Sequence, residues 1–240
     1  RLSAHERQYI MDHSEAKLLF ADTELLGNTK MLRAENPTLQ ALIELTDDQF
    51  TGQRPDVAVD AVLDELLAEA SDAKLPYSVE DERAPITLNY TSGTTGKPKG
   101  VLYSHRGSYL NSLGEAMHQG LNSATRYLWT LPMFHCNGWC TPGAVTAAGG
   151  THLCLRAVRE DSVWDAIENL GTTHLCGAPT VCSIIADASR AHELDEPLRI
   201  TTAGAPPSPA IISKLQHLGI EEVHVYGLPE VYGPYTICEY

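Results

Sequence analysis

Long hydrophobic runs are missing from this sequence of 240 residues. A helix that crosses a bilayer needs roughly 20 consecutive apolar residues, and no stretch of the chain approaches that length. The first residue is Arg1, and the residues after it have neither the apolar core of a signal peptide nor the composition of a transit peptide. We therefore expect no transmembrane segment, and a cytoplasmic protein whose given sequence begins inside a domain.

Positive charge is also scarce, because 17 Lys and Arg residues stand against 31 Asp and Glu residues and leave a formal net charge of −14. This charge repels nucleic acid phosphates and anionic lipid surfaces. No nucleic acid partner is expected, and an anionic ligand would have to be held by a local group of donors.

The six cysteines lack the regular spacing of a disulfide framework. A chain of this length can bury a core without covalent cross-links. We expect reduced thiols.

Short apolar or β-branched runs alternate with amphipathic stretches, which is typical of βαβ units that build a largely parallel sheet. The sequence therefore predicts an α/β fold. Strands are expected over residues 17–21, 39–45, 86–91, 126–131, 151–155, 173–176, 200–203 and 222–226. Helices are expected over residues 59–70, 106–118, 162–170, 181–189 and 208–218. The polar segment 71–85 is interpreted as a surface connection and a candidate junction between two subdomains.

The tetrapeptide Thr-His-Leu-Cys occurs twice, at residues 151–154 and 173–176. If the two strands were neighbours, they would offer a tetrahedral zinc set, made of His152, Cys154, His174 and Cys176. The preferred interpretation is that buried strands favour similar residues, with Cys acting as a small hydrophobe. A second cluster lacks an obvious fourth ligand and consists of His135, Cys136 and Cys140.

Residues 90–100 read Tyr-Thr-Ser-Gly-Thr-Thr-Gly-Lys-Pro-Lys-Gly and lie between the expected strand 86–91 and the apolar run 101–103. Glycines bring backbone N–H groups close to a ligand, and hydroxyls and lysines bind phosphate oxygens. A Walker A loop needs four residues between its glycines and a Ser or Thr after its lysine. Here two residues separate Gly93 from Gly96, and Pro98 follows Lys97. The segment is interpreted as a phosphate loop that joins two strands, and a plain surface hairpin is the alternative.

This loop resembles the phosphate loop of the acyl-adenylate-forming, AMP-binding superfamily, which includes acyl-CoA synthetases, luciferases and peptide-synthetase adenylation domains. Three later segments agree in order. Residues 131–139 resemble the acyl-site motif, residues 202–207 the adenine-binding loop, and residues 225–230 the Tyr-Gly-x-Thr-Glu motif. The resemblance covers essentially the whole chain and implies a partial large N-terminal domain over residues 1–240, without the small C-terminal domain.

The resemblance implies an acid–thiol ligase of the acyl-CoA synthetase branch. Such an enzyme joins a small-molecule carboxylic acid to ATP, with Mg²⁺, and transfers the acyl group from the adenylate to coenzyme A. The phosphate-binding residues would be Thr91, Ser92, Gly93, Thr94, Thr95, Gly96, Lys97 and Lys99. The adenine site would contain Gly204, Ala205, Pro206, Tyr226 and Gly227, and Pro229 would be a further nucleotide-binding position. The acyl pocket would contain His135, Asn137 and Trp139, and the catalytic groups would be His135, Lys97 and the magnesium ligand Glu230.

The segment around His135 offers no acidic side chain that could pair with a substrate ammonium, so the resemblance implies an acid without an α-amino group. The indole of Trp139 favours short, medium or aromatic acids. A carrier protein in place of coenzyme A, a homodimer of the intact enzyme and an organellar address at a missing terminus stay open.

Two departures from the family pattern bear on activity. Pro229 stands where the family has Thr, and proline lacks both the hydroxyl and the N–H that could bond phosphate. We therefore expect impaired adenylation, and a nucleotide-binding relic is the alternative function. The family's ribose-binding Asp, hinge and catalytic Lys would follow Tyr240, so little coenzyme A ligation is expected from this chain alone.

Overall fold

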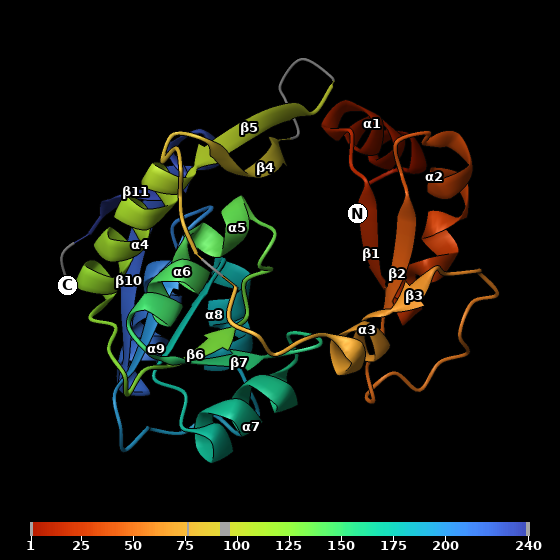
Figure 1. Cartoon of the computed structure of the whole chain (residues 1–240). Coiled ribbons are helices and arrows are strands. Elements are labelled where there is room, and N and C mark those ends of the chain that lie inside the picture. The colour runs from red at the N-terminus through yellow and green to blue at the C-terminus, as the bar shows by residue number, and fades with distance from the viewer. Residues whose placement is uncertain (1, 76, 92–96, 239–240) are drawn as a thin grey trace. The chain divides into compact units, whose positions relative to one another are not determined.

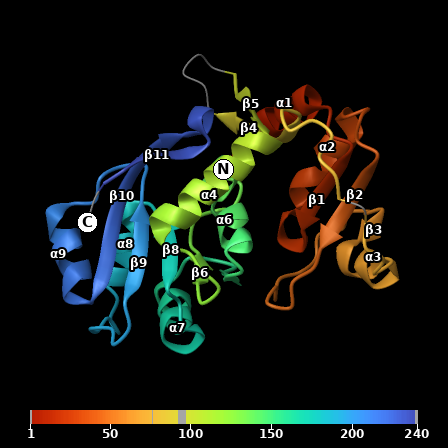
Figure 2. The same cartoon turned by 60° about the vertical axis from the view of Figure 1, so that its left-hand side comes forward.

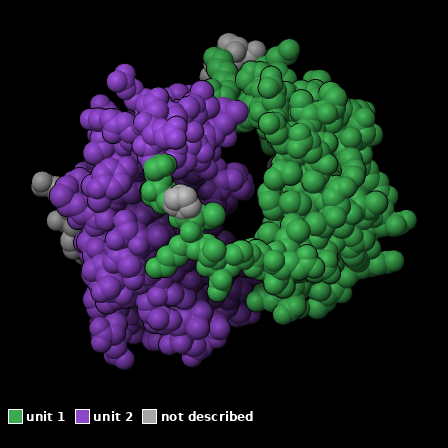
Figure 3. Space-filling view, viewed as in Figure 1, with its two compact units in different colours: residues 1–78, 90–100 green, residues 79–89, 101–240 purple. Residues whose placement is uncertain are grey.

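A computed structural model of the chain describes residues 2–75, 77–91 and 97–238. The chain divides into two compact units, which Figure 3 shows in different colours: residues 1–78 with 90–100, and residues 79–89 with 101–240. The step from residue 78 to 79 falls inside the polar segment 71–85. The assignment of a subdomain junction to that segment stays a prediction.

The first unit contains a three-stranded parallel sheet in the order β1-β2-β3. The strands are β1 (Leu18–Asp22), β2 (Ala41–Leu45) and β3 (Ala61–Val62), and the helices are α1 (Ala4–Ser14), the 3-10 helix η1 (Thr23–Thr29), α2 (Lys30–Glu35) and α3 (Leu63–Glu69). Its core consists of Ala21, Leu26 and Leu42. The helix expected over residues 59–70 begins only at Leu63, because residues 61 and 62 pair with β2.

The second unit is built on a six-stranded sheet in the order β11-β10-β9-β8-β6-β7 (Figure 1 and Figure 2). The strands are β6 (Arg126–Trp129), β7 (Thr151–Cys154), β8 (His174–Gly177), β9 (Leu198–Thr202), β10 (Ile220–Leu228) and β11 (Gly233–Ile237). All neighbouring strands run parallel except β11, which is antiparallel to β10. The expected parallel α/β sheet is confirmed, whereas β11 was not predicted.

Helices cover both faces of this sheet, because side chains alternate along each strand. On one face, Leu128 and Leu175 pack against α7 (Glu160–Leu170), α8 (Pro179–Ala186) and α9 (Pro209–His217). On the other face, Tyr127 and Cys176 pack with Trp139. That face carries α4 (His105–Gln119), α5 (Cys136–Trp139) and α6 (Thr141–Ala147) (Figure 1).

The strands that flank the expected phosphate loop are β4 (Pro85–Thr91) and β5 (Lys99–Ser104), and they pair with each other. The prediction that the loop joins two strands is therefore confirmed. Residues 92–96 lie outside the described residues. The chain enters α4 directly after β5, with the hydroxyl of Ser104 accepting a hydrogen bond from the N–H of Gly107 at 3.1 Å.

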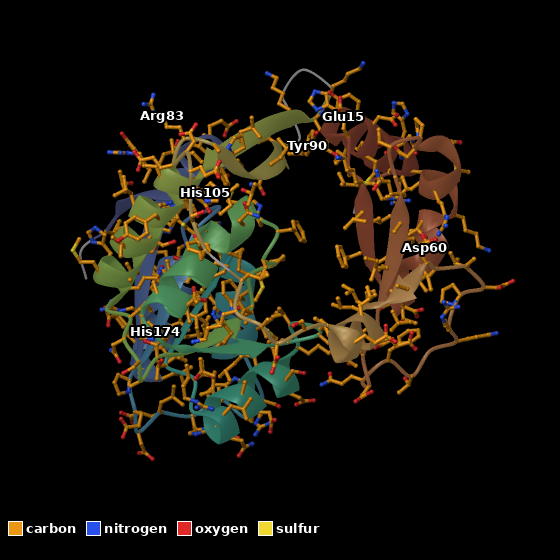
Figure 4. All side chains as sticks on the ribbon, in the orientation of Figure 1. Glu15, Asp60, Arg83, Tyr90, His105 and His174 are labelled. Carbon is orange, nitrogen blue, oxygen red and sulfur yellow. The ribbon has the colours of Figure 1, made fainter. Side chains whose placement is uncertain are left out.

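The zinc hypothesis is wrong, because β6 lies between the two Thr-His-Leu-Cys strands β7 and β8. His152 Nδ1 accepts a hydrogen bond from the indole N–H of Trp129 at 3.0 Å. His174, labelled in Figure 4, donates from Nε2 to the carbonyl of Gln119 at 3.0 Å. Within the described ranges no group of three His, Cys, Asp or Glu residues could hold a metal ion.

The six cysteines all fall in the described part of the chain and are unpaired, as expected. Among the described residues, no helix is long and apolar enough to cross a membrane.

Candidate active site

A cavity of about 140 Å³ lies beyond the end of β9, against the last residues of β10 and the α5 segment that follows β6 in the chain. Ligands of parallel α/β sheets bind at this edge, outside the carboxyl ends of the strands. The cavity brings together five residues that the sequence singles out: His135, Trp139, Gly204, Gly227 and Pro229. All five belong to the second unit, and they come from three separate chain segments.

One wall of the cavity depends on two glycines. The register between β10 and β11 shifts at Gly227, which brings its backbone against that of Gly233. A Cβ atom on Gly227 would lie 1.7 Å from the carbonyl oxygen of Gly233. Gly233 has a φ of +97°, and a Cβ there would lie 3.0 Å from Cα of Trp139. Only residues without a side chain fit at both positions.

The segment from Cys136 to Cys140 forms a left-handed turn in which all five residues have φ between 46° and 64°. This conformation costs about 1–2 kcal/mol for each residue other than glycine. The amide oxygen of Asn137 holds the turn against β4, because it accepts hydrogen bonds from Thr87 Oγ1 at 2.7 Å and from Asn89 Nδ2 at 2.6 Å. The turn thereby fixes the positions of His135 and Trp139, which line the cavity.

The two ends of this turn lie differently. His135 precedes it with an exposed side chain, and Trp139 is buried, and both line the cavity. Asn137 does not line it, because its amide is directed to Thr87 and Asn89. The place of Asn137 in the acyl pocket stays a prediction.

Replacing Asn137 by Ala is expected to lower the free energy of unfolding by about 1–3 kcal/mol. The change leaves the Thr87 and Asn89 donors without their acceptor and puts a residue that disfavours the left-handed region there. Asn137→Gly removes the amide but suits the left-handed backbone conformation, so its loss of unfolding free energy should be smaller. Urea unfolding of both variants measures the two contributions, and an unchanged midpoint for the Ala variant would contradict this role.

The short 3-10 helix η2 (Pro229–Val231) forms the rim that carries Pro229 and Glu230. The hydroxyl of Tyr103 donates to the carbonyl of Pro229 at 2.8 Å, and the Tyr103 ring stacks on Tyr232 with centroids 3.7 Å apart. Burial raises the pKa of Tyr103 well above its ordinary value and that of Tyr232 to about 12. Tyr103 therefore stays a neutral donor and holds the rim, while the carboxylate of Glu230 is exposed.

Cys136 lies next to His135 and lines the same cavity. Burial, and after it the charge of Glu230, raises the pKa of the Cys136 thiol to about 11. At neutral pH the thiol is protonated, so Cys136 acts as a small apolar wall residue and not as a nucleophile.

The predicted adenine-site residues are open to a ligand. Gly204 has a φ of +88°, and a Cβ atom there would meet nothing within 4 Å. Ala205 and Pro206 are exposed, and Tyr226 is 60% exposed. Gly204, Ala205 and Pro206 therefore follow the end of β9, and Tyr226 lies within β10; none of the four is packed into the core.

The residues that flank the expected phosphate loop belong to the first unit. Thr91 ends β4, while the side chains of Lys97 and Lys99 are exposed, and the Lys97 ammonium lies 5.6 Å from the ring centroid of Tyr9. Tyr90, labelled in Figure 4, pairs its hydroxyl with Nδ1 of His13 at 2.8 Å. The other predicted loop residues lie outside the described part of the chain: Ser92, Gly93, Thr94, Thr95 and Gly96.

The sequence analysis did not identify the residues that hold the left-handed turn and the rim of the cavity in place. Thr87 and Asn89 are two apart in the expected strand 86–91 and therefore share a face, so two polar residues on one face were an available signal. Tyr103 and Tyr232 gave no signal, because their contact joins positions far apart in the sequence.

The sequence model of the AMP-binding enzyme family matches residues 1–239. The peroxisomal trans-cinnamate:CoA ligase of Petunia hybrida is 37% identical over 255 aligned positions that cover 100% of this chain and 45% of that protein. The 4-hydroxybutyrate–CoA ligase 2 of Metallosphaera sedula is 37% identical, with 100% and 44% covered. The chain thus spans slightly less than half the length of these relatives.

Solved structures show the same α/β fold. The inhibitor-bound N-terminal domain of FACL13 from Mycobacterium tuberculosis superposes with a TM-score of 0.81 at 25% identity, covering 99% of this chain and 57% of that one. The O-succinylbenzoate coenzyme A synthetase of Bacillus subtilis, in complex with ATP and magnesium ion, gives a TM-score of 0.78 at 22% identity, covering 99% and 45%.

Proposed function

Because the chain belongs to the AMP-binding enzyme family, we propose that the complete protein carrying it is an AMP-forming acid–thiol ligase. It would activate a carboxylic acid with ATP and pass the acyl group to coenzyme A. The observation that carries this proposal is the cavity that gathers His135, Trp139, Gly204, Gly227 and Pro229 at the carboxyl edge of the parallel sheet. A single cavity thereby receives both the acyl-site and the adenine-site segments.

The residues present fit an adenine nucleotide. Tyr226 leaves its ring largely exposed for stacking on a base, and the open space at Gly204 admits a flat ring beside the backbone. Lys97 and Lys99 supply positive charge in a chain whose net charge is −14, and both side chains are exposed. We assign the nucleotide's base to Tyr226 and Gly204, and the resemblance of the loop assigns its phosphates to Thr91, Lys97 and Lys99.

Glu230 is the residue proposed to hold Mg²⁺. This hard cation prefers oxygen ligands, keeps several waters and usually takes only one or two carboxylates. An exposed carboxylate on a rim that Tyr103 holds through the Pro229 carbonyl suits that requirement. When bound, Mg²⁺ would neutralise charge on the phosphate oxygens.

In the proposed reaction, a carboxylate oxygen of the acid forms a bond to the α-phosphorus of ATP, and the bond from that phosphorus to the pyrophosphate oxygen breaks. His135 would contact the carboxylate and orient it, because its exposed side chain lines the cavity. Lys97 would donate to phosphate oxygens and stabilise the charge that moves onto pyrophosphate. The contribution of the chain is therefore positioning and charge stabilisation.

The proposed substrate is a short, medium or aromatic acid without an α-amino group. The buried residue Trp139 is among those that line a cavity of about 140 Å³, and a cavity of this volume leaves little room for a long chain. The relatives named for trans-cinnamate and 4-hydroxybutyrate act on acids of this kind.

Exchange of labelled pyrophosphate into ATP by the complete protein, measured with short, medium and aromatic acids, tests the proposal. We expect exchange that depends on the acid and falls at least tenfold in His135→Ala. Absence of exchange with every acid would overturn the assignment as a working ligase.

A second candidate function, a catalytically impaired relative that still binds nucleotide, is favoured by Pro229. Replacing Pro229 by Thr is expected to raise the exchange rate ten- to more than a hundredfold, because a regained hydrogen bond to a charged phosphate contributes ~1.5–3 kcal/mol. The Tyr103 hydroxyl contacts the backbone carbonyl at 229, which Thr keeps, so the rim should fold as before. Exchange only in the variant would identify a disabled enzyme, and no gain would contradict the role given to position 229.

A further inference from the structure

A second depression, of about 790 Å³, runs along α4 on the face of the sheet that carries the candidate active site. It is bounded by Gly114 and His118 of α4 and by Arg199, Glu221 and Tyr235 of β9, β10 and β11. We refer to it as the α4 groove. All of its walls belong to the second unit.

A small space of about 10 Å³ adjoins the α4 groove. It shares Val225 with the active-site cavity, and it shares Glu115 and Val223, among others, with the α4 groove. Val223 and Val225 are two apart on β10 and therefore face the same side of the sheet. The residues that line the three spaces therefore follow one another along one sheet face, and we refer to the small space as the neck.

The neck is polar, although the strands around it belong to the core. Glu115 and Gln119, one helical turn apart on α4, both line it, and they are 3% and 6% exposed. The amide nitrogen of Gln119 donates to Glu115 Oε2 at 2.7 Å. Within the described ranges, Gln119 Oε1 is buried without a hydrogen-bond partner, and no cationic side chain forms a salt bridge with Glu115.

A buried acceptor without a partner is costly, so a group that donates to it is expected. The neck has about the volume that one water or one hydroxyl group occupies. Burial raises the pKa of Glu115 to about 7, which leaves its carboxyl partly protonated near neutral pH and able to donate as well as accept. The neck therefore suits a single hydroxyl group.

We propose that Glu115 and Gln119 form the end wall of the acid-binding site and select carboxylic acids whose tail ends in a hydroxyl or another hydrogen-bond donor. This inference rests on the proposed function and names its substrate class. The tail of the acid passes Val225 from the active-site cavity and ends in the neck, where its donor meets Gln119 Oε1. A methyl-ended tail of the same length displaces water from the neck and leaves that oxygen without a partner.

Sites built to bond a substrate hydroxyl reject analogues that lack it far more strongly than apolar pockets reject an extra methylene. We therefore expect matched acids to differ, at the chain length that reaches the neck, by at least about tenfold in kcat/KM. If the end wall only limited chain length, the methyl-ended and the hydroxylated acid of one length would have equal kcat/KM values.

The experiment measures acid-dependent pyrophosphate exchange by the complete protein with straight-chain acids of increasing length, each as a methyl-ended and a terminally hydroxylated pair. We expect the hydroxylated acid to be preferred at one length. The double change Glu115→Leu with Gln119→Leu should reverse that preference, and Glu115→Gln should keep it. Tyr235→Ala, which alters the α4 groove and not the neck, should leave it unchanged.

The outcomes separate the two proposals. Equal kcat/KM values within every pair, or a hydroxyl preference that persists in the double variant, would overturn the end wall while leaving the ligase assignment intact. A preference abolished by Tyr235→Ala would place the tail in the α4 groove and overturn the role of the neck. Absence of exchange with every acid would overturn the proposed function and this inference with it. Unfolding midpoints of all variants report whether each one is folded.

Discussion

Replacing Gly227 by Ala is expected to lower the free energy of unfolding by about 3 kcal/mol or more, at the upper end of what overpacking costs. A Cβ at this position would lie 1.7 Å from the carbonyl oxygen of Gly233 and 2.4 Å from its carbonyl carbon. Both atoms are backbone, so no side-chain rotation relieves the clash. The β10–β11 pair must separate where it lines the cavity, and binding of an adenine nucleotide should weaken with it.

Gly114→Ala is the matched control for this substitution. Gly114 lies inside α4, and a Cβ there would meet nothing within 4 Å. Alanine in a helix interior is favoured over glycine by about 1 kcal/mol, so this variant should be slightly more stable than the parent chain. Urea unfolding of both variants gives the comparison. Equal stability of the Gly227→Ala variant and the parent would contradict the close contact between the backbones of Gly227 and Gly233.

The sequence predicts most of the second unit because its signals are local. Apolar runs and amphipathic periodicity located β6 to β10 and the helices α7 to α9 within a few residues. The strand β11 was missed because its segment begins with Gly233 and Pro234 and lacks an apolar run. The left-handed turn was missed for a different reason, since one glycine among its five residues gives little indication of positive φ throughout.

Part of the candidate site could likewise be predicted from the sequence, and part could not. Motif resemblance selected His135, Trp139, Gly204, Gly227 and Pro229, and these line one cavity. Resemblance could not show that Asn137 turns toward β4, because that depends on how the backbone of the turn is held. The buried pair on α4 was equally invisible, since a Glu and a Gln four residues apart usually lie on an exposed helix face.

Glu115→Gln is expected to stabilise the chain by roughly 3 kcal/mol at pH 8 and by almost nothing at pH 4. Desolvation raises the pKa of Glu115 from its ordinary value of 4.5 to about 7, and the hydrogen bond from Gln119 offsets only part of this. The folded chain therefore holds a proton that the unfolded chain releases between these two pH values, so its stability falls as pH rises through that window. The difference between the two pKa values corresponds to roughly 3 kcal/mol of unfolding free energy.

Unfolding in urea at pH 4, 6 and 8 measures this difference between the parent chain and the variant. Glutamine keeps the acceptor for the Gln119 amide and removes only the ionisable group, so other titrating residues cancel in the difference. Glu65→Gln on the exposed face of α3 is the control and should change stability by less than about 0.5 kcal/mol at either extreme. A stabilisation that does not grow between pH 4 and pH 8 would contradict an uncompensated buried carboxyl. A stabilisation that grows with pH would mean that Glu115 destabilises the folded chain when its carboxyl is ionised. A destabilising acid beside the candidate active site is expected where the side chain serves to bind a ligand.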